Sequence, residues 1–234
     1  MGDTANFGIA LLDAAQAQKH VTVNEALLRV DALAARRVES FGATMPPTGV
    51  EGQAHVVGTS ATGDWLGHDG EIAIWLNDGW DFVAARIGWR VLDGATGEEA
   101  VFDGTAWVPG GIAVSPTGAQ TVMRVAEIEH TLAAGATSTT AAVIPDKAVV
   151  IGVTARVTGA IGGASTWSMG VAGSTDRYGT GYGTGAGSYA HGVTGQPLAY
   201  YGDTALVLTA EGGNFSGGTV RLAVHYMALT PPAG

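Results

Sequence analysis

The chain has 234 residues, a formal net charge of −10, 37 glycines and no cysteine. An acidic chain of this kind lacks the basic surface that nucleic acids and anionic membranes require, so neither is an expected partner. Without cysteine, disulfides and thiolate metal sites are excluded. Abundant glycine without a collagen repeat is typical of a compact β protein with tight turns.

The N-terminal segment, residues 1–13, has neither a basic start nor a long apolar run. We therefore expect no secretory signal peptide and no membrane span in it. Phe7, Ile9 and Leu11 alternate with other residues, which is typical of a strand or a docking segment. A frayed terminus is the alternative.

One amphipathic helix is predicted over about residues 22–36. Its apolar residues recur at steps of three and four, which places them on one stripe: Val23, Ala26, Leu27, Val30, Leu33 and Ala34. Thr22 and Glu25 have the spacing of a capping box, in which each side chain bonds to a backbone amide of the first turn. The stripe gives the helix a face to bury against a β-rich body.

Residues 63–108 predict two β-hairpins that carry most of the tryptophans. Asn77-Asp78-Gly79 separates two apolar runs, and Asp103-Gly104 separates two more. These residues tolerate the positive φ that tight hairpin turns need. Five of the six tryptophans fall within this segment. We expect them mainly in a core, with an exposed platform for glycans as the alternative.

Residues 109–122 combine Pro, Gly and Ser without any charge, which predicts a linker. The linker would separate an N-terminal attachment domain, residues 1–108, from a C-terminal domain, residues 123–234. Strand patterns occur in the second domain over residues 126–132, 137–144, 148–157, 166–171, 204–209 and 219–229. The predicted fold is mainly β, ending in an antiparallel, jelly-roll-like β-sandwich that is the candidate receptor-binding domain.

The last of these predicted strands alternates cleanly between apolar and mixed positions. Successive side chains of a strand point to opposite faces. One face would carry Val220, Leu222, Val224 and Tyr226, and the other would carry Arg221, Ala223, His225 and Met227.

A glycine-rich segment, residues 177–189, has glycine at every second position from Gly179 to Gly187. In an extended conformation these glycines share one face, and the opposite face carries Tyr178 and Tyr182. Aromatic rings stack on the apolar faces of sugars, and hydroxyls supply hydrogen bonds. The predicted carbohydrate-binding residues are Trp167, Asp176, Arg177, Tyr178, Tyr182, Tyr189 and His191. A flexible loop and a subunit interface are the alternatives for this segment.

Several carboxylates lie close together in the sequence or beside the glycine-rich segment: Asp64, Asp69, Glu71, Asp78, Asp81 and Asp176. Glycoside hydrolysis needs two carboxyl groups at a fixed separation across the sugar, and the sequence specifies no such pair. The histidines lack paired ligand spacing, and no serine stands in a nucleophile elbow. We therefore expect no catalysis, no metal and no cofactor.

Several unusual stretches follow one another along the first half of the chain: AQAQKHVTVNEALLRVDAL, Pro46-Pro47, Glu51-Gly52, ATGDWLGHDGEIAIW, GWRV and VFDGTAWV. The C-terminal stretch GGTVRLAVHYMAL closes the pattern. Together they resemble a family of uncharacterised domains encoded in alphaproteobacterial prophages and gene transfer agents. The resemblance implies a head-spike or fibre protein of the virion surface that binds host capsular polysaccharide.

Further expectations follow from that resemblance and from the glycine-rich composition. The partners would be host cell-surface polysaccharide, other virion or capsid proteins, and copies of the chain itself, with a trimer favoured and a pentamer possible. The protein would be made in the bacterial cytoplasm and released by lysis. Two other functions remain open: a capsule-degrading glycan hydrolase, and a structural spike base that holds a separate fibre.

Overall fold

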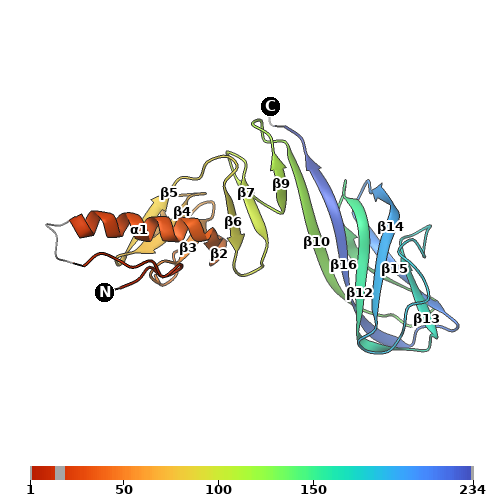
Figure 1. Ribbon diagram of the computed structural model, residues 1–234. Helices are drawn as coiled ribbons and strands as arrows, with labels where there is room; N and C mark the ends of the chain where they lie inside the picture. The colour runs from red at the N-terminus through yellow and green to blue at the C-terminus, as the bar shows by residue number, and fades with distance from the viewer. Residues whose placement is uncertain (1, 14–18, 233–234) are drawn as a thin grey trace. The chain divides into compact units, whose positions relative to one another are not determined.

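The computed structural model describes residues 2–13 and 19–232, and it divides the chain into two compact units. The first unit is Met1–Gln120 with Pro232–Gly234, and the second is Thr121–Pro231. Strands dominate both units, and helix α1 (Lys19–Ala35) belongs to the first (Figure 1). The fold is therefore mainly β, as the sequence predicted. Within the described residues, no helix is long and apolar enough to cross a membrane.

The first unit contains two four-stranded sheets. One has the order β2 (Ser40–Ala43), β3 (Ala54–Val57), β4 (Ile72–Leu76) and β5 (Gly79–Val83). The other has the order β1 (Arg37–Val38), β6 (Arg90–Asp93), β7 (Glu99–Phe102) and β8 (Trp107–Pro109). The β1–β6 and β2–β3 pairs are parallel, whereas the other pairs in these sheets are antiparallel. A short 3-10 helix, η1 (Gly63–Trp65), lies between β3 and β4 in the chain.

Both predicted hairpins are confirmed. Strands β4 and β5 pair antiparallel, with Trp75 opposite Trp80, and the turn between them places Asn77 and Asp78 at φ 51° and 61°. Strands β7 and β8 pair in the same way, with Phe102 opposite Trp107. The Asp103 carboxylate accepts the backbone N–H of Thr105 and of Ala106, which closes the second turn.

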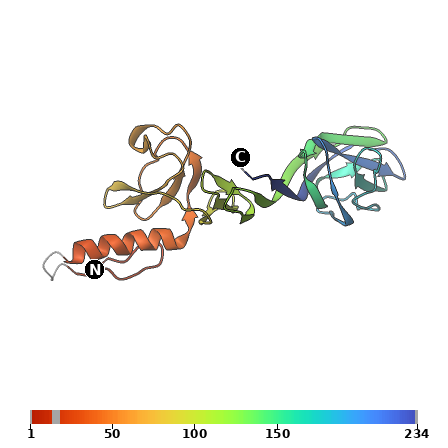
Figure 2. The same ribbon diagram turned by 90° about the horizontal axis from the view of Figure 1, so that it is seen from above.

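Helix α1 differs from its prediction in its start and in its buried face. It already includes Lys19, so Thr22 is an exposed residue of the helix interior and forms no cap. The buried side chains are Leu28, Asp31 and Ala32, whereas Val23 and Val30 of the predicted stripe are exposed. Figure 2 shows α1 running beside the strands of this unit. The helix therefore buries a face that includes a carboxylate.

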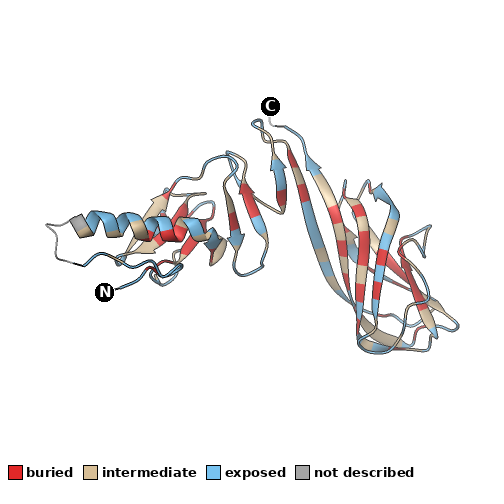
Figure 3. Cartoon of the chain, viewed as in Figure 1, coloured by how far each residue is buried: buried red, intermediate tan, exposed pale blue. Residues whose placement is uncertain are grey.

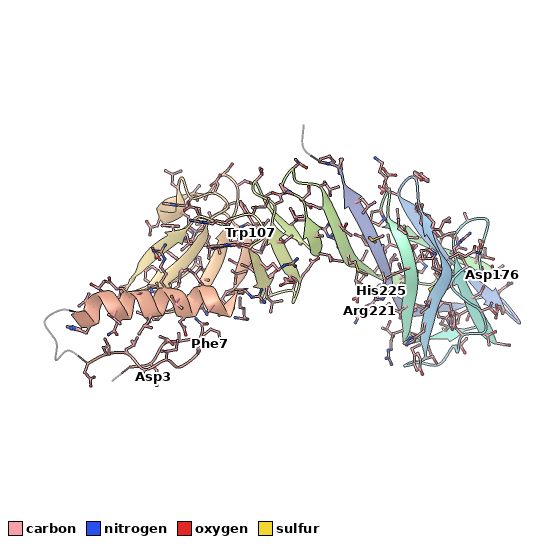
Figure 4. The ribbon with its side chains drawn as sticks, turned by 45° about the horizontal axis from the view of Figure 1, so that its top comes forward. Asp3, Phe7, Trp107, Asp176, Arg221 and His225 are labelled. Atoms are coloured by element: carbon pink, nitrogen blue, oxygen red, sulfur yellow. The ribbon has the colours of Figure 1, made fainter. Side chains whose placement is uncertain are left out.

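That carboxylate holds the N-terminal segment against the helix. Asp31 is 1% exposed, and its oxygens accept hydrogen bonds from the Thr4 hydroxyl at 2.6 Å, the Asn6 N–H at 2.8 Å and the Phe7 N–H at 2.9 Å. The segment folds back on itself through a bridge between Asp3 and Ala10. Figure 4 shows Asp3 and Phe7 alongside α1. Residues 2–13 are thus an ordered docking segment.

Strand β3 is buried on both faces, so the first unit has two small cores. Ala54 and Val56 pack in a cluster with Ala32 of α1 and with Trp107. Val57 packs in a second cluster with Trp65, which is fully buried. His55 is also buried, and its ring contacts Trp65 in a tilted arrangement and Trp80 in an edge-on one. Trp65 and Trp107 are therefore core residues, as expected, and Trp80 and Trp89 pack against these clusters, whereas Trp75 belongs to neither.

The segment expected to be a linker is largely structured. Residues 109–122 contain strand β9 (Gly111–Val114) and the first residues of β10 (Gln120–Thr131). Between them, the Ser115 N–H donates to the Ala119 carbonyl and the Ser115 hydroxyl accepts the Ala119 N–H, which closes a tight turn. Pro, Gly and Ser mark a hairpin-like turn here because that geometry needs the same residues that flexible linkers use.

The second unit consists of two antiparallel sheets that share one core. One sheet contains, in order, β14 (Tyr189–Ala199), β12 (Val149–Gly162), β16 (Gly217–Thr230) and β10. The other has the order β11 (Thr137–Ile144), β15 (Thr204–Glu211) and β13 (Thr166–Gly170). Residues from both sheets, such as Leu222 of β16 and Leu208 of β15, meet in a single apolar cluster. This arrangement is the predicted sandwich.

The predicted alternation of the last strand is confirmed. Val220, Leu222, Val224 and Tyr226 of β16 are buried, whereas the residues between them are exposed or half-buried. Figure 3 shows this alternation as bands along the strands of the sheet. The sheet of β14, β12, β16 and β10 therefore has one face in the core and one face that is open to solvent.

Candidate functional site

The aromatic residues predicted to bind sugar from the glycine-rich segment are part of the core. Trp167 and Tyr178 are each 1% exposed, and both belong to the apolar cluster of the second unit. The Tyr178 hydroxyl hydrogen-bonds to the buried Tyr200 hydroxyl at 2.7 Å. Burial raises the pKa of Tyr178 above its usual value, with a further contribution from that hydrogen bond. The prediction that Tyr178 and Trp167 contact a ligand is therefore wrong.

Tyr182 is half-buried and turned inward as well. Its ring lies 5.2 Å from that of Trp167, and its hydroxyl donates to the Tyr178 carbonyl. Its backbone forms two hydrogen bonds with Trp167 of β13, N–H to carbonyl in both directions. The segment thus extends the sheet edge and covers the core, and its tyrosines face inward.

The reason is visible in the backbone of this segment. Gly179, Gly181 and Gly187 adopt positive φ, so the chain turns repeatedly and the strict alternation of a strand is lost. A side chain at Gly179 would lie 2.1 Å from the Tyr182 hydroxyl. These glycines allow Tyr178 and Tyr182 to pack tightly. A flexible loop would not need glycine for that purpose.

The last two predicted residues, Tyr189 and His191, lie on the open face of the sheet. They come from β14, whose alternate residues Ala190 and Gly192 face the core. Tyr189 is 63% exposed, and its ring lies 5.3 Å from that of His191 in an edge-on arrangement. Two neighbouring residues of the prediction are therefore brought together at the surface.

A third residue, Arg156 of β12, completes this surface. It stands opposite Tyr189 in the β12–β14 register, as Thr154 stands opposite His191. The guanidinium carbon lies 5.8 Å from the Tyr189 ring centre, and Nη1 donates to the Gly187 carbonyl at 3.0 Å. Arg156, Tyr189 and His191 line an open hollow. We call these three residues the β14 patch.

The neighbouring strand β16 extends the polar surface. Arg221 stands opposite Arg156, and His225 Nε2 lies 3.0 Å from the Thr154 hydroxyl. Figure 4 shows Arg221 and His225 on the same strand. The charge of Arg221 is balanced by Glu129 at 2.7 Å and by Glu127 at 3.6 Å. Arg156 forms no ion pair within the described residues, so the β14 patch carries a positive charge that no carboxylate balances.

Asp176 and Arg177 do not join the β14 patch. Both follow β13 in a turn, in which the Arg177 N–H donates to the Ser174 carbonyl and the Asp176 carbonyl accepts the Gly179 N–H. Within the described part of the chain, no hydrogen bond or ring contact connects either residue to Tyr189 or His191. Two of the seven predicted residues thus meet at one surface.

Three of the six carboxylates considered for hydrolysis hold a turn or an ion pair. Asp69 accepts the N–H groups of Ser60 and Ala61, and these hydrogen bonds lower its pKa. Asp81 pairs with Arg29 at 3.0 Å, and Glu71 lies 2.8 Å from His68 Nδ1. Among the described residues, no group of three or more His, Asp and Glu side chains could hold a metal ion.

Sequence reasoning missed Arg156, although a signal for it exists. Along β12, Thr154, Arg156 and Thr158 alternate with Val153, Ala155 and Val157. This alternation marks a strand with one polar face, in the same way as the alternation of β16. Recognising both strands as neighbours would have placed Arg156 and Arg221 on one surface.

Comparison with known proteins gives a family match and a structural match that bear on this chain. Residues 23–108 match the family model described as "Protein of unknown function (DUF2793)", which lies within the first unit. A chain of the cyanophage Pam1 capsid asymmetric unit aligns with a TM-score of 0.37 and 24% sequence identity, over 51% of this chain and 86% of that one. No curated protein matches the chain.

Proposed function

We propose that this protein is a virion-surface component that adheres to anionic cell-surface polysaccharide through the β14 patch. The observation that carries the proposal is the exposed row in which the Tyr189 ring stands between His191 and the unpaired cation of Arg156. An exposed ring offers a stacking surface for a sugar, and arginine supplies paired donors for a carboxylate. A uronic-acid sugar presents both features.

The proposal assigns separate roles to the two units. The first unit, which includes the family match, attaches the protein to other virion proteins, and the second presents the β14 patch to the host. The sequence resemblance to proteins of prophages and gene transfer agents supports the virion location. Adhesion without cleavage is proposed because three of the six candidate carboxylates, those of Asp69, Glu71 and Asp81, are engaged in turns and ion pairs. We also retain the trimer as part of this proposal.

The experiment compares two exposed tyrosines of the second unit. Tyr189→Ala removes the stacking ring of the patch, whereas Tyr201→Ala removes a ring that is 89% exposed in the turn before β15. Binding of the full chain to alginate, a polyuronate, is measured alongside dextran as the neutral polymer. We expect Tyr189→Ala to weaken alginate binding about tenfold, the effect of losing an aromatic anchor. Tyr201→Ala should leave binding unchanged.

The same incubation separates the other functions. A falling polymer length would identify a hydrolase, and an absence of retention on any acidic polysaccharide would favour a structural base. Equal binding by the two tyrosine variants would contradict the assignment of the β14 patch. Native mass measurement of the full chain tests the trimer directly, since a monomer or a pentamer would give a different mass.

A further inference from the structure

The first unit contains an apolar pocket that the proposed adhesion does not use. The pocket has a volume of about 490 Å³ and lies among helix α1, both sheets and the segment before β6. Its walls include Ala32 and Leu33 of α1, Val38 of β1, Ile72 of β4, Trp89 of the segment before β6, and Val91 of β6. A volume of this size falls within the range of small-molecule sites.

Three arginines also line this pocket: Arg36, Arg37 and Arg90. Residues 1–120 carry only six basic side chains against 15 acidic ones, so half of the basic groups of this region gather here. Arg37 pairs with Glu39, and Arg90 pairs with Glu99 at 3.2 Å. Nη2 of Arg90 also donates to the Ile112 carbonyl at 2.6 Å. These two guanidinium groups are therefore neutralised.

Arg36 is different, because its guanidinium has no ion pair or hydrogen bond within the described residues. It follows directly after the last helical residue and has a φ of 50°. Its backbone carbonyl accepts the Leu92 N–H at 2.6 Å, which fixes the main chain at this point against β6. The pocket thus has apolar walls and one exposed cation that is free to pair.

These features select a class of ligand. Sugar hydroxyls would lose water in this pocket without gaining partners, so polysaccharide is a poor occupant. An aliphatic chain gains free energy for each methylene that it buries, and a carboxylate gains a charge-assisted hydrogen bond from a guanidinium. We propose that the pocket binds an aliphatic carboxylate, with its chain between α1 and the sheets and its carboxylate on Arg36.

Titration of the full-length protein with hexanoate, octanoate and decanoate, each below its micelle concentration, tests whether the aliphatic chain of the ligand is buried in the pocket. Each added methylene should tighten binding about fourfold, which corresponds to about 0.8 kcal/mol per buried methylene. Decanol, which has the same chain and no charge, should bind about tenfold more weakly than decanoate, because it lacks the charge-assisted hydrogen bond. Affinity that does not change with chain length would overturn the proposal.

Variants test the role of Arg36. Arg36→Gln should weaken decanoate about tenfold and leave decanol unchanged, since only the charged contact is lost. Arg86→Gln is the matched control, because Arg86 is an exposed arginine of the same unit that does not line the pocket. If both arginine variants weaken decanoate equally, general electrostatic attraction explains the binding and the site is wrong.

A second pair of variants keeps the proposal testable if Arg36→Gln is unstable. Val30 lines the pocket and is exposed, so it tolerates a long polar side chain. Val30→Glu places a negative charge near the carboxylate, and Val30→Lys places a positive charge at the same position. We expect decanoate to bind at least about fivefold more tightly to the lysine variant, by the attraction between nearby charges. Equal affinities would count against a carboxylate at this rim.

Discussion

The first unit buries charged and ionisable side chains, whereas the second unit builds its core almost entirely from apolar ones. In the first unit Asp31 and His55 are buried beside small apolar clusters. In the second, one continuous cluster extends across both sheets. An apolar pattern in the sequence therefore locates the core of the second unit, whose buried side chains are almost all apolar. It does not locate the buried positions of the first unit that hold Asp31 and His55.

The difference extends to net charge. Residues 1–120 carry six basic and 15 acidic side chains, whereas residues 121–234 carry five and six. The second unit is therefore nearly neutral. The carboxylates of Glu127 and Glu129 pair with Arg221, so they do not neutralise Arg156. A nearly neutral unit can approach an anionic polymer without strong repulsion.

The largest expected effect distinguishes core from binding site in the second unit. Tyr178→Ala should lower the free energy of unfolding of this unit by about 4 kcal/mol, the usual cost of deleting a buried aromatic ring. Tyr178→Phe keeps the ring and should cost about 1 kcal/mol for the lost hydrogen bond to Tyr200. Chemical denaturation monitored by circular dichroism measures both. A stable Tyr178→Ala variant would mean that this ring is not part of the core.

The next effect tests the buried carboxylate of the first unit. Asp31→Ala should cost about 3 kcal/mol, because it removes several hydrogen bonds to a charged acceptor. It should also release residues 2–13, seen as rapid hydrogen exchange at the Asn6 and Phe7 amides. Glu25→Ala, at an exposed helix position, is the control. Retained protection at both amides in the Asp31 variant would show that other contacts hold the segment.

The pH dependence of stability in the acidic range tests the role of the same carboxylate, Asp31. Burial by itself raises the pKa of Asp31, but the hydrogen bonds from Thr4, Asn6 and Phe7 outweigh it and hold the pKa below its usual value. This contribution to stability is therefore present above about pH 4 and is lost as the pH falls through the lowered pKa. Protection of the Phe7 amide should fall in that range together with the unfolding free energy.

A further pH effect arises from His55. Burial lowers its pKa below the ordinary value of 6.5, so the unfolded chain binds a proton at a pH where the folded chain does not. The contribution of His55 to the free energy of unfolding is fully present above about pH 6.5. Below that pH it falls by no more than about 1.4 kcal/mol per pH unit. His55→Phe should remove this slope between pH 6.5 and 5. The same slope in wild type and variant would assign it to another group, such as His130.

The sequence predicted the second unit well because its strands follow simple alternation. Residues 137–144 form β11 as predicted, and the faces of β16 match residue by residue. Strand β14 was not predicted because its large side chains lie on the exposed face and its small residues on the buried one. Tyr189 and Val193 face outward, and Ala190 and Gly192 face the core. The small inward residues are needed because Tyr178 packs there; a side chain at Gly192 would lie 2.3 Å from the Tyr178 carbonyl.

The first unit was harder to predict because polar contacts decide its packing. Hydropathy favours the stripe of Val23 and Val30, but the helix turns Asp31 inward to meet the N-terminal segment. Nothing in the local sequence pairs Thr4 with a carboxylate 27 residues away. For a similar reason only part of the candidate site could be predicted from the sequence. Tyr189 and His191 are close in sequence, but Arg156 is brought to them only by the pairing of β12 with β14.

The smallest expected effect concerns the start of the helix. Thr22 is an exposed residue within α1, so Thr22→Ala should change the free energy of unfolding by no more than about 0.5 kcal/mol, in the stabilising direction. Thermal unfolding measures this change. A loss of about 1 kcal/mol, the usual cost of removing a cap, would restore the capping role that the sequence predicted.

The most direct test of the account is amide NMR of the full chain titrated with uronate oligosaccharides. If the β14 patch is the contact surface, chemical-shift changes should concentrate at residues 189–193 and 154–156, and residues 178–184 should shift little because their tyrosines point into the core. Tyr189→Ala should abolish the changes, and Tyr201→Ala should preserve them. Shifts centred on residues 178–184 or in the first unit, with none at residues 189–193, would contradict the account.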